Sequence, residues 1–490
     1  MALTPLIVSL LRSREPSALP GAHWTTRRAF FLGLVTGIVC FSGTLYWLVE
    51  TMTTFGGLPT PVALLAAGLL VAYLSLFPAA FAVAVARLRT SLGVTGAALC
   101  AAPIWVASEL GRQYVWDGFP WALLGYSQVT VLPIAQLASV TGVYGLSFLL
   151  VLTSSAVALV VVDTARRARW TVGIAVAAIV AGCAVWGQWR IAEGSLTAAG
   201  DTIRTAVVQG NIAQDDKWDP ALRDEIIGRY VSLTRQAIAQ GATFVIWPES
   251  SLPVYFEDDL RGHVVRRLAR ETGATLLIGS DQLERARPDA TPDAPDNRLY
   301  NAAFLIQPDG SVGGVYRKMH LVPFGEYVPL QRLLFFVGPI VEAVSNFTPG
   351  DRPVLLPVGG RMVSNAICYE VIYGSLIRRF VLDGSELLTT ITNDAWYGWS
   401  SAAYQHWDQA AMRAIENGRY LARAANTGVS GFVDPYGRVV EKSKLFEQTV
   451  LVGDIRLART RTVYTRTGDL IAWLSLAFTA AALIASLKKF

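Results

Sequence analysis

The sequence predicts two parts: a multi-span α-helical membrane domain and a layered α/β domain. The 490 residues are 52% hydrophobic and only 16% charged, whereas soluble domains contain about 25% charged residues. Long uncharged apolar runs occur near both ends of the chain. Between them, short β-rich runs alternate with helical patterns, which is typical of an α/β domain. This composition excludes disorder, a collagen repeat and a disulfide scaffold.

Six apolar runs are long enough to cross the bilayer core, which takes about 20 helical residues. They lie at about 29–50, 61–86, 93–110, 134–162, 170–188 and 469–487. One such run could be a buried core helix, but six together predict membrane spans. The first 12 residues are also apolar. They are too short to span and lack a small-residue cleavage site, so we expect no cleaved signal peptide.

Basic residues outside the central block fall on alternate loops between these runs. They are Arg12, Arg14, Arg27, Arg28, Arg87, Arg89, Arg166, Arg167, Arg169, Lys488 and Lys489. The positive-inside rule makes this side cytoplasmic. The central block then lies on the opposite face, in the periplasm or at the cell exterior. We therefore expect a transmembrane domain at 1–189, an extracytoplasmic domain at 190–467 and a C-terminal transmembrane helix at 468–490.

The charge balance of the central block argues against nucleic-acid binding. From Arg190 to Thr467 there are 30 basic and 31 acidic residues, so there is no excess of positive charge to meet phosphates. This block contains one cysteine, Cys368, which has no partner there for a disulfide. A chemical role for Cys368 is therefore favoured over a structural one. The four histidines show no ligand spacing, and we expect no metal site.

The central block shows alternating strand and helix patterns. Strands are predicted at Ile203–Gln209, Thr243–Trp247, Ala274–Gly279, Ala302–Gln307, Met362–Cys368, Leu387–Thr392 and Gly431–Asp434. Helices are predicted at 220–239, 257–272, 370–382 and 403–424. The stretch Asp281–Arg298 is rich in Asp, Pro and Arg and predicts a solvated loop.

Three short segments near predicted strand ends contain the candidate chemistry. WPES at 247–250 ends a strand and places Glu249 at the sheet edge. YRKMHLVPFGEY at 316–327 follows a hairpin and presents Lys318. NAICYE at 365–370 closes a strand just before a predicted helix. Cys368 would therefore lie near a helix N-terminus, whose partial positive charge favours the thiolate.

Glu, Lys and Cys in this order resemble the catalytic triad of the nitrilase superfamily. Further motifs narrow the resemblance to the apolipoprotein N-acyltransferase family. They are KMHLVPFGEYVP at 318–329, GFPW at 118–121 and GYSQ at 125–128. Together with the apolar runs they extend the resemblance over nearly the whole chain. This family usually has eight spans, whereas six are predicted here together with the short stretch at 1–12.

The resemblance implies an αββα sandwich for the central block and an acyl transfer in the bacterial cytoplasmic (inner) membrane. A phospholipid would donate an acyl chain to the N-terminal amine of the S-diacylglyceryl cysteine of an apolipoprotein, the last step of lipoprotein maturation. Cys368 would carry the chain as a thioester, Glu249 would be the base and Lys318 would stabilise the oxyanion. Burial would raise the pKa of Glu249. No cofactor is implied, and we expect a monomer.

The resemblance also assigns supporting positions. Glu326 and Glu370 would orient Lys318 or the incoming amine, although an ordinary surface or helix-start carboxylate is the alternative for each. Tyr369 resembles the family residue beside the nucleophile, and Trp218 resembles a position near the substrate. Core packing is the alternative for both aromatic residues.

Several apolar residues fit a lipid substrate. LLFFVGPIV at 333–341 is too short to span, and Phe335 and Phe336 within it could gate acyl-chain access or simply cover the core. An interfacial belt, an acyl-chain wall or ordinary packing would suit Trp396, Tyr397 and Trp399. At the non-cytoplasmic end of the third span, a headgroup contact or a snorkelling pair is expected for Glu109, Arg112 and Asp117.

Two other classes of function remain open. A membrane-tethered amidase or nitrilase acting on a small polar amide would use the same triad, but it gives no reason for the six spans. A transporter or channel with an inert exported domain would need ionisable groups within the spans. These spans contain almost none, which argues against transport.

Overall fold

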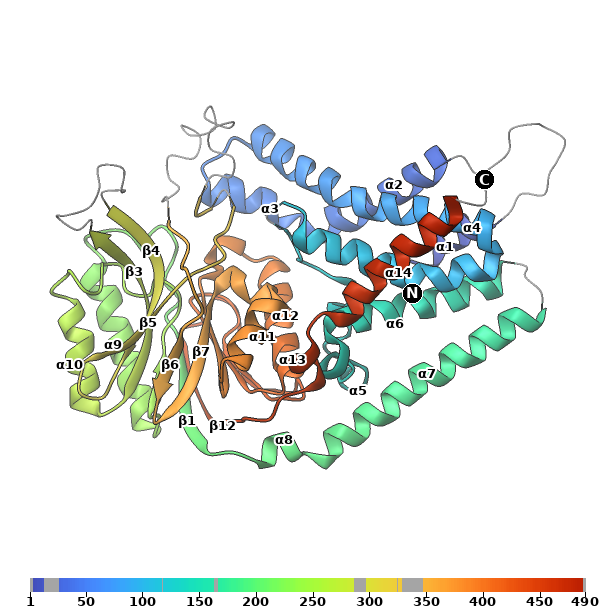
Figure 1. The fold of residues 1–490 in the computed structure, drawn as a ribbon. Helices are drawn as coiled ribbons and strands as arrows, with labels where there is room; N and C mark the ends of the chain where they lie inside the picture. The colour runs from blue at the N-terminus through green and yellow to red at the C-terminus, as the bar shows by residue number, and fades with distance from the viewer. Residues whose placement is uncertain are drawn as a thin grey trace. The chain divides into compact units, whose positions relative to one another are not determined.

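The computed structural model describes residues 3–12, 26–116, 118–162, 166–285, 297–323, 325–327 and 347–487, with only the backbone of residues 166 and 168. The chain divides into two compact units (Figure 1). The first consists of Met1–Val49, Thr60–Glu193 and Thr462–Phe490, and the second of Glu50–Pro59 and Gly194–Arg461.

The first unit is helical. Its elements are α1 (Thr4–Leu11), α2 (Thr26–Leu45), α4 (Thr60–Tyr114), η2 (Leu124–Gln128), α5 (Leu132–Ala135), α6 (Ala138–Val161), α7 (Arg166–Glu193), α13 (Val463–Thr467) and α14 (Leu470–Leu487), with α3 (Trp47–Glu50) at its boundary. Among the described residues, five helices are long and apolar enough to cross a membrane: α2, α4, α6, the stretch Arg169–Ala198 and α14.

Two of the predicted spans, 61–86 and 93–110, lie in the 55-residue element α4. Gly93 interrupts this element with φ 72° and ψ −177°, a conformation that glycine adopts readily because it has no Cβ. The rings of Tyr73 and Trp116 stack 5.0 Å apart, and those of Phe81 and Trp105 meet edge-on at 5.2 Å. In each pair the two residues lie at similar distances along the chain before and after Gly93. The two halves of α4 therefore run antiparallel and form a helical hairpin. The six predicted spans therefore occupy five long helices.

The apolar start of the chain belongs to the core of this unit. It forms α1, which packs against α4 and α6. Ile7 and Leu10 are fully buried in a cluster with Phe81 and Leu159. In a membrane domain such close packing stabilises helix association through van der Waals contacts.

The described residues of the second unit form two six-stranded sheets, with strand orders β12-β1-β2-β3-β4-β5 and β11-β10-β9-β8-β7-β6. The strands are β1 (Thr202–Gln209), β2 (Phe244–Ile246), β3 (Thr275–Arg285), β4 (Asn297–Ile306), β5 (Val312–Arg317), β6 (Leu355–Val358), β7 (Arg361–Ile367), β8 (Leu387–Thr392), β9 (Leu421–Ala425), β10 (Gly431–Val433), β11 (Val439–Lys442) and β12 (Thr449–Arg456). In each sheet three parallel strands, β1–β3 or β7–β9, are flanked by antiparallel ones.

Helices cover the outer face of each sheet (Figure 1). The first sheet packs against α9 (Arg223–Ala239) and α10 (Gly262–Thr272), and the second against α11 (Gly374–Leu382) and α12 (Ala402–Asn417). The stacking of Tyr230 on Trp247, 5.0 Å between ring centroids, joins α9 to the end of β2. Because β1 also contacts β9 and β4 contacts β7, the two sheets face each other. The predicted αββα sandwich is confirmed.

One predicted helix is wrong at its C-terminal end. The predicted helix 403–424 ends at Asn417, and residues 421–425 form β9 within the second sheet. Gly418 has φ 60°, the left-handed conformation that commonly ends a helix. Residues 421–425 are fully buried between β8 and β10, where tertiary packing overrides the helical preference of their alanines.

Other predicted boundaries also need correction. The predicted helix 370–382 is a 3₁₀ turn, η4 (Cys368–Ile372), followed by α11. The predicted loop Asp281–Arg298 is shorter, because β3 continues to Arg285 and β4 begins at Asn297. The sequence patterns did not predict β5, β6, β11 and β12. These are short or partly exposed strands without a clear apolar alternation.

Candidate active site

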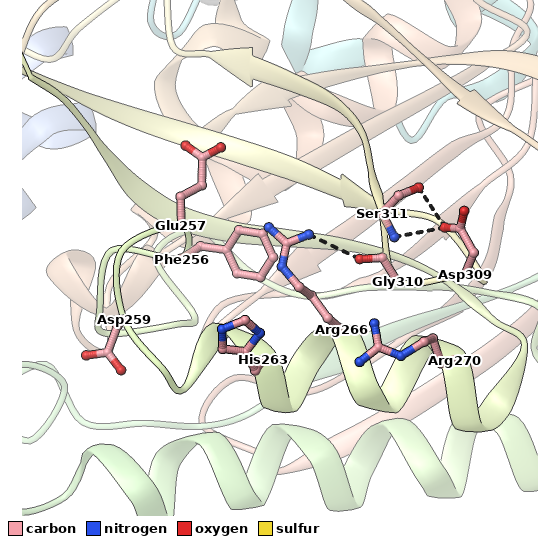
Figure 2. A pocket seen from close by; sticks show the side chains of 9 residues that line it. All are labelled: Phe256, Glu257, Asp259, His263, Arg266, Arg270, Asp309, Gly310 and Ser311. Carbon is pink, nitrogen blue, oxygen red and sulfur yellow. Dashed lines mark hydrogen bonds between the residues drawn. The ribbon is translucent and has the colours of Figure 1, made fainter.

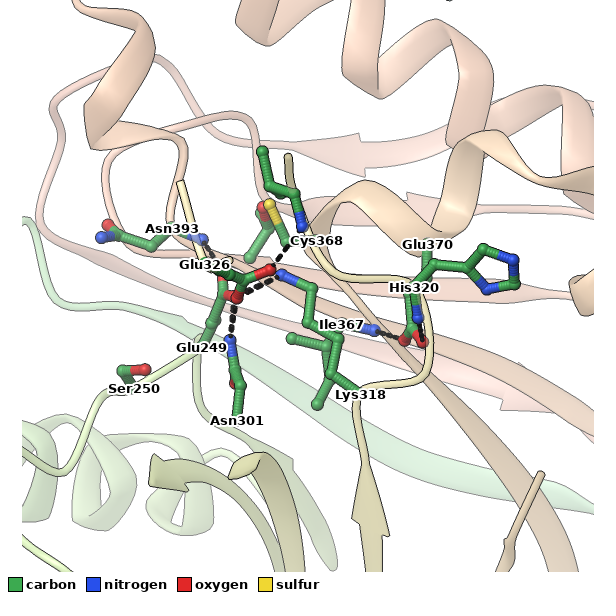
Figure 3. Close-up of polar contacts among 12 residues, drawn as sticks. Glu249, Ser250, Asn301, Lys318, His320, Glu326, Ile367, Cys368, Glu370 and Asn393 are labelled. Carbon is green, nitrogen blue, oxygen red and sulfur yellow. Dashed lines mark hydrogen bonds and ion pairs between the residues drawn. The ribbon is translucent and has the colours of Figure 1, made fainter. Parts of the chain in front are cut away.

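Three strand ends bring together the residues predicted to form the triad. Glu249 follows β2 and Lys318 follows β5, both in the first sheet, whereas Cys368 follows β7 in the second sheet. All three residues are buried, with exposed fractions of 7%, 1% and 8%. Figure 3 shows their side chains pointing toward one another. The site thus lies between the two sheets of the sandwich.

A hydrogen-bond network fixes the carboxylate of Glu249. Its Oε1 accepts from Asn301 Nδ2 at 2.7 Å and from Lys318 Nζ at 3.2 Å. Its Oε2 accepts from the backbone N–H of Asn393 at 2.9 Å. Lys318 Nζ also donates to Glu326 Oε1 at 2.9 Å (Figure 3). The Lys318 ammonium therefore lies between the buried carboxylates of Glu249 and Glu326. These bonds restrict the rotation of the Glu249 and Lys318 side chains.

The protonation state of Glu249 differs from the expectation. Burial opposes its ionisation, but the positive charges of Lys318 and Lys217, with the hydrogen bonds from Asn301 and Asn393, lower its pKa. The predicted rise in the pKa of Glu249 is therefore wrong. The reason is the number of cations and donors around it, which the sequence order alone does not reveal.

Cys368 begins η4 with φ 51°, in the left-handed region that residues with a Cβ rarely adopt. Burial and the negative charge of Glu249 raise the pKa of the Cys368 thiol, although Lys318 and a hydrogen bond with Thr392 act in the opposite direction. The expectation that a helix N-terminus favours the thiolate is thus wrong at rest. A protonated thiol beside an ionised carboxylate is a pair prepared for proton transfer.

Glu370 connects the two segments that carry the candidate lysine and cysteine. Its Oε1 accepts from Tyr316 Oη at 2.7 Å and from the backbone N–H groups of Met319 at 2.7 Å and His320 at 3.2 Å. Its Oε2 accepts from the Ile367 N–H at 2.7 Å. Burial raises the pKa of Glu370 to about 7, although these donors oppose the rise. The side chain is fully buried, so the alternative of a surface carboxylate is wrong.

The other predicted supporting residues lie at different depths. Glu326 is buried, and its Oε2 accepts from the Val322 N–H at 2.8 Å, which orients the carboxylate toward Lys318. Tyr369 is 4% exposed and meets Tyr373 edge-on at 5.4 Å. Trp218 differs, because 44% of its surface is exposed, so it is not a core residue.

The residues expected to contact lipid are only partly described. Trp396 is 38% exposed; its ring meets Phe55 of η1 (Thr51–Phe55) edge-on at 5.7 Å, and its carbonyl accepts from Thr51 Oγ1 at 2.8 Å. In the same segment, Trp399 is 76% exposed. The predicted gate residues, Phe335 and Phe336, lie outside the described residues.

The predicted charged cluster of the helical unit is not a snorkelling surface pair. Glu109 and Arg112 are only 2% and 4% exposed within the described structure. Glu109 Oε1 accepts from Trp105 Nε1 at 3.0 Å and from the Leu124 N–H at 2.7 Å. The carboxylate thus ties η2 to α4. Asp117 lies outside the described residues.

Sequence reasoning missed several polar residues of the site. Lys217 is buried, and its Nζ donates to the backbone carbonyl of Glu249 at 3.1 Å. Burial lowers the pKa of Lys217 to about 8, against the pull of nearby acids. Asn301 and Asn393 both donate to Glu249. Asn393 directly follows β8, and a polar residue at the end of an apolar strand was the signal that could have found it.

A separate cavity of about 460 Å³ lies beside α10, near the turn between β4 and β5 (Figure 2). Its lining combines acidic and basic side chains, and no triad residue contributes to it. Arg266 donates to the Gly310 carbonyl at 3.1 Å across it. Among the described residues no group of three or more His, Cys, Asp or Glu side chains is arranged to hold a metal ion.

The αββα sandwich and the buried Glu, Lys and Cys define a protein of the carbon-nitrogen hydrolase class. Residues 204–465 match the carbon-nitrogen hydrolase family, and residues 2–156 match the apolipoprotein N-acyltransferase N-terminal domain. The chain belongs to the apolipoprotein N-acyltransferase family and is an N-acyltransferase. This membership removes the transporter interpretation.

Similar proteins cover almost the entire chain. The apolipoprotein N-acyltransferase of Geobacter metallireducens is 39% identical over 94% of this chain and 87% of its own length. That of Methylococcus capsulatus is 34% identical over 95% of this chain and 88% of its own length. Among solved structures, an amidase from Nesterenkonia sp. is 23% identical over 53% of this chain and 93% of its own, with a TM-score of 0.39.

Proposed function

We propose that this enzyme transfers an acyl chain from a membrane phospholipid to the N-terminal amine of the S-diacylglyceryl cysteine of an apolipoprotein, through a thioester on Cys368. One observation carries the proposal: a buried thiol lies beside an ionised carboxylate and an ammonium group, in a chain whose described residues include five long apolar helices. The name of the relatives, apolipoprotein N-acyltransferase, supports an apolipoprotein as the acceptor of the acyl chain.

In the first step the sulfur of Cys368 attacks the ester carbonyl of the phospholipid while its proton passes to Glu249. A free thiolate beside the Glu249 carboxylate is unfavourable, so proton transfer and S–C bond formation occur together. Lys318 and the backbone N–H of Tyr369 stabilise the oxyanion, and one such donor contributes about 100- to 1,000-fold in rate. When the C–O bond breaks, Glu249 returns the proton to the leaving lysophospholipid alcohol.

In the second step the apolipoprotein amine attacks the thioester carbonyl. Glu249 accepts the amine proton and then protonates the departing sulfur of Cys368, which regenerates the thiol. Because Lys318 already contacts Glu249 and Glu326, it remains in place for both oxyanions without reorganisation. The two-step route predicts ping-pong kinetics.

The remaining sequence-based expectations complete the proposal. The transmembrane segments are 1–189 and 468–490, and the catalytic domain, 190–467, lies on the periplasmic side of the inner membrane of a monomeric enzyme. Phe335, Phe336 and Trp396 form the lid or lipid entry for the acyl chain, and Trp218 contacts the substrate. The partial exposure of both tryptophans supports these roles.

Mass spectrometry of lipoprotein N-termini tests the proposal. Wild-type enzyme should yield three acyl chains per lipoprotein, whereas Cys368→Ala should leave two. Cys183→Ala, in a predicted span, is the matched control and should yield three. Triacylated product made by Cys368→Ala would contradict the proposal. Release of ammonia from short amides without acyl transfer would instead support the membrane-tethered amidase.

A further inference from the structure

Behind the nucleophile lies a buried charged cluster that the reaction steps above do not use. Asp394 begins η5 (Asp394–Tyr397), His406 lies in α12 and Arg423 lies in β9. All three are at most 1% exposed. Asp394 Oδ2 accepts from Arg423 Nη2 at 2.8 Å, and Asp394 Oδ1 lies 3.0 Å from His406 Nδ1. Isolated buried charges are costly, so such a cluster persists only when its members are paired.

This cluster contacts the backbone of Cys368. His406 Nε2 lies 3.1 Å from the Cys368 carbonyl oxygen, at hydrogen-bonding distance. Cys368 itself has φ 51°, and a left-handed conformation at a residue with a Cβ costs roughly 1–3 kcal/mol. A hydrogen bond to this carbonyl offsets part of that cost and fixes the direction of the Cys368 side chain.

The contacts of His406 define which ring nitrogen carries the proton. Arg423 Nη2 lies 2.9 Å from Nδ1. A backbone carbonyl oxygen can only accept, so Nε2 carries the hydrogen that faces Cys368, while Nδ1 lies within hydrogen-bonding distance of both Arg423 Nη2 and Asp394 Oδ1. Burial and the charge of Arg423 lower the pKa of His406, which agrees with a neutral ring. The Nε2–H group therefore donates to the Cys368 carbonyl.

A second residue links the cluster to Cys368. Thr392 Oγ1 donates to Asp394 Oδ1 at 2.8 Å, and the same side chain lies close enough to Cys368 to act on the pKa of its thiol. Thr392 is the last residue of β8 and is fully buried. The cluster thus contacts the Cys368 carbonyl through His406 and lies beside the Cys368 side chain at Thr392.

We propose that His406 is a positioning residue for the acyl-transfer nucleophile: its Nε2–H holds the Cys368 carbonyl, Asp394 and Arg423 fix the ring at Nδ1, and Thr392 connects this cluster to the Cys368 side chain. The proposal rests on the proposed role of Cys368 and adds to it a second group of residues that do not touch the substrate. Without this cluster the thiol remains near Glu249 and Lys318 but loses its fixed direction.

Two substitutions of His406 separate positioning from folding. His406→Gln places an amide N–H near the former Nε2, whereas His406→Asn reaches only the position of Nδ1. In the full-length enzyme, His406→Asn should lower the rates of thioester formation and of Cys368 alkylation by iodoacetamide by about tenfold. This factor corresponds to about 1.4 kcal/mol, within the range of one hydrogen bond. His406→Gln should restore both rates to within about threefold of wild type, with a similar unfolding temperature for the two variants.

Equal losses in the two variants, no loss in either, or losses that follow the unfolding temperature would overturn the proposal. If His406→Asn does not fold, the pair Thr392→Val and Thr392→Ser tests the same cluster. Valine should slow alkylation about tenfold and serine should restore it, and equal rates would overturn the role of Thr392. Cys368→Ala is assayed in parallel. Acyl transfer by Cys368→Ala would refute the nucleophile itself, whereas the alkylation rates judge only its positioning.

Discussion

Two buried glutamates of the site, Glu249 and Glu370, have pKa values that are shifted in opposite directions. Glu249 is surrounded by two ammonium groups and by amide donors, which lower its pKa despite its burial. Glu370 contacts one phenol and three backbone N–H groups, and burial raises its pKa to about 7. Burial is therefore similar in the two cases, and the nearby cations decide the charge.

This difference separates two tasks. A carboxylate held ionised beside a thiol can accept its proton, as general base catalysis requires. A carboxylate bonded mainly to backbone groups of two loops instead fixes the distance between those loops. When environments push the pKa values of two acids apart, different roles follow. The predictions below remove, in turn, what makes the two glutamates different.

Removing the central cation should have the largest effect. Lys318→Met leaves Glu249 and Glu326 buried without their shared ammonium. The free energy of unfolding should fall by about 3–5 kcal/mol, and acyl transfer should fall at least 100-fold. The control is Arg317→Met, which removes a partly exposed cation paired with Glu284 and should cost about 0–1 kcal/mol. Thermal unfolding in detergent and single-turnover transfer measure both effects; similar losses in both variants would contradict the account.

Neutralising the proposed base should affect the rate more than stability. Glu249→Gln keeps the size of the side chain but removes its ability to accept the thiol proton. Thioester formation should slow by about 100- to 10,000-fold, while Lys318 keeps its partner Glu326. Rapid-quench mass spectrometry of the enzyme measures this rate. A loss smaller than tenfold would show that another group takes the proton.

Glu370 should contribute to the pH dependence of the free energy of unfolding. The pKa of Glu370 is raised in the folded state, so its contribution is present below pH about 4.5 and is lost as pH rises through about 7. The free energy of unfolding should therefore fall across this window, and Glu370→Gln should flatten part of the fall. Burial also raises the pKa of Asp281 to about 7, so Asp281 should cause the part of the fall that remains in Glu370→Gln. An unchanged slope in Glu370→Gln would contradict the assignment.

The smallest effect should come from a single donor to Glu370. Tyr316→Phe removes one of its four hydrogen bonds and no charge. The free energy of unfolding should fall by about 1 kcal/mol, and acyl transfer should stay within about threefold of wild type. Chemical denaturation measures the change. A loss of activity as large as that of Lys318→Met would place Tyr316 in the proton-transfer system instead.

The sequence predicted those parts of the molecule that depend on local pattern. The apolar runs became long helices, and WPES and CYE directly follow strands β2 and β7. Strand β9 was missed because LARAA has helix-forming residues and only burial between two neighbours makes it a strand. Gly418 was a local signal for the end of the helix.

The electrostatics of the site could not be predicted from the order of residues. Lys217 lies 32 positions before Glu249, and Asn393 lies 144 positions after it, yet both contact this residue. The direction of the Glu249 pKa depends on such distant partners, so a prediction from burial alone failed. The same holds for His406, which looked like an isolated histidine but contacts Cys368 across 38 residues.

The central claim is tested most directly by incubating the enzyme with phospholipid that carries an isotopically labelled acyl chain, without an apolipoprotein acceptor. Mass spectrometry should find that label on the peptide containing Cys368. Hydroxylamine should release it, and adding an amine acceptor should transfer it. An enzyme preparation that is active in acyl transfer but carries no label, or carries the label on another residue, would contradict the account.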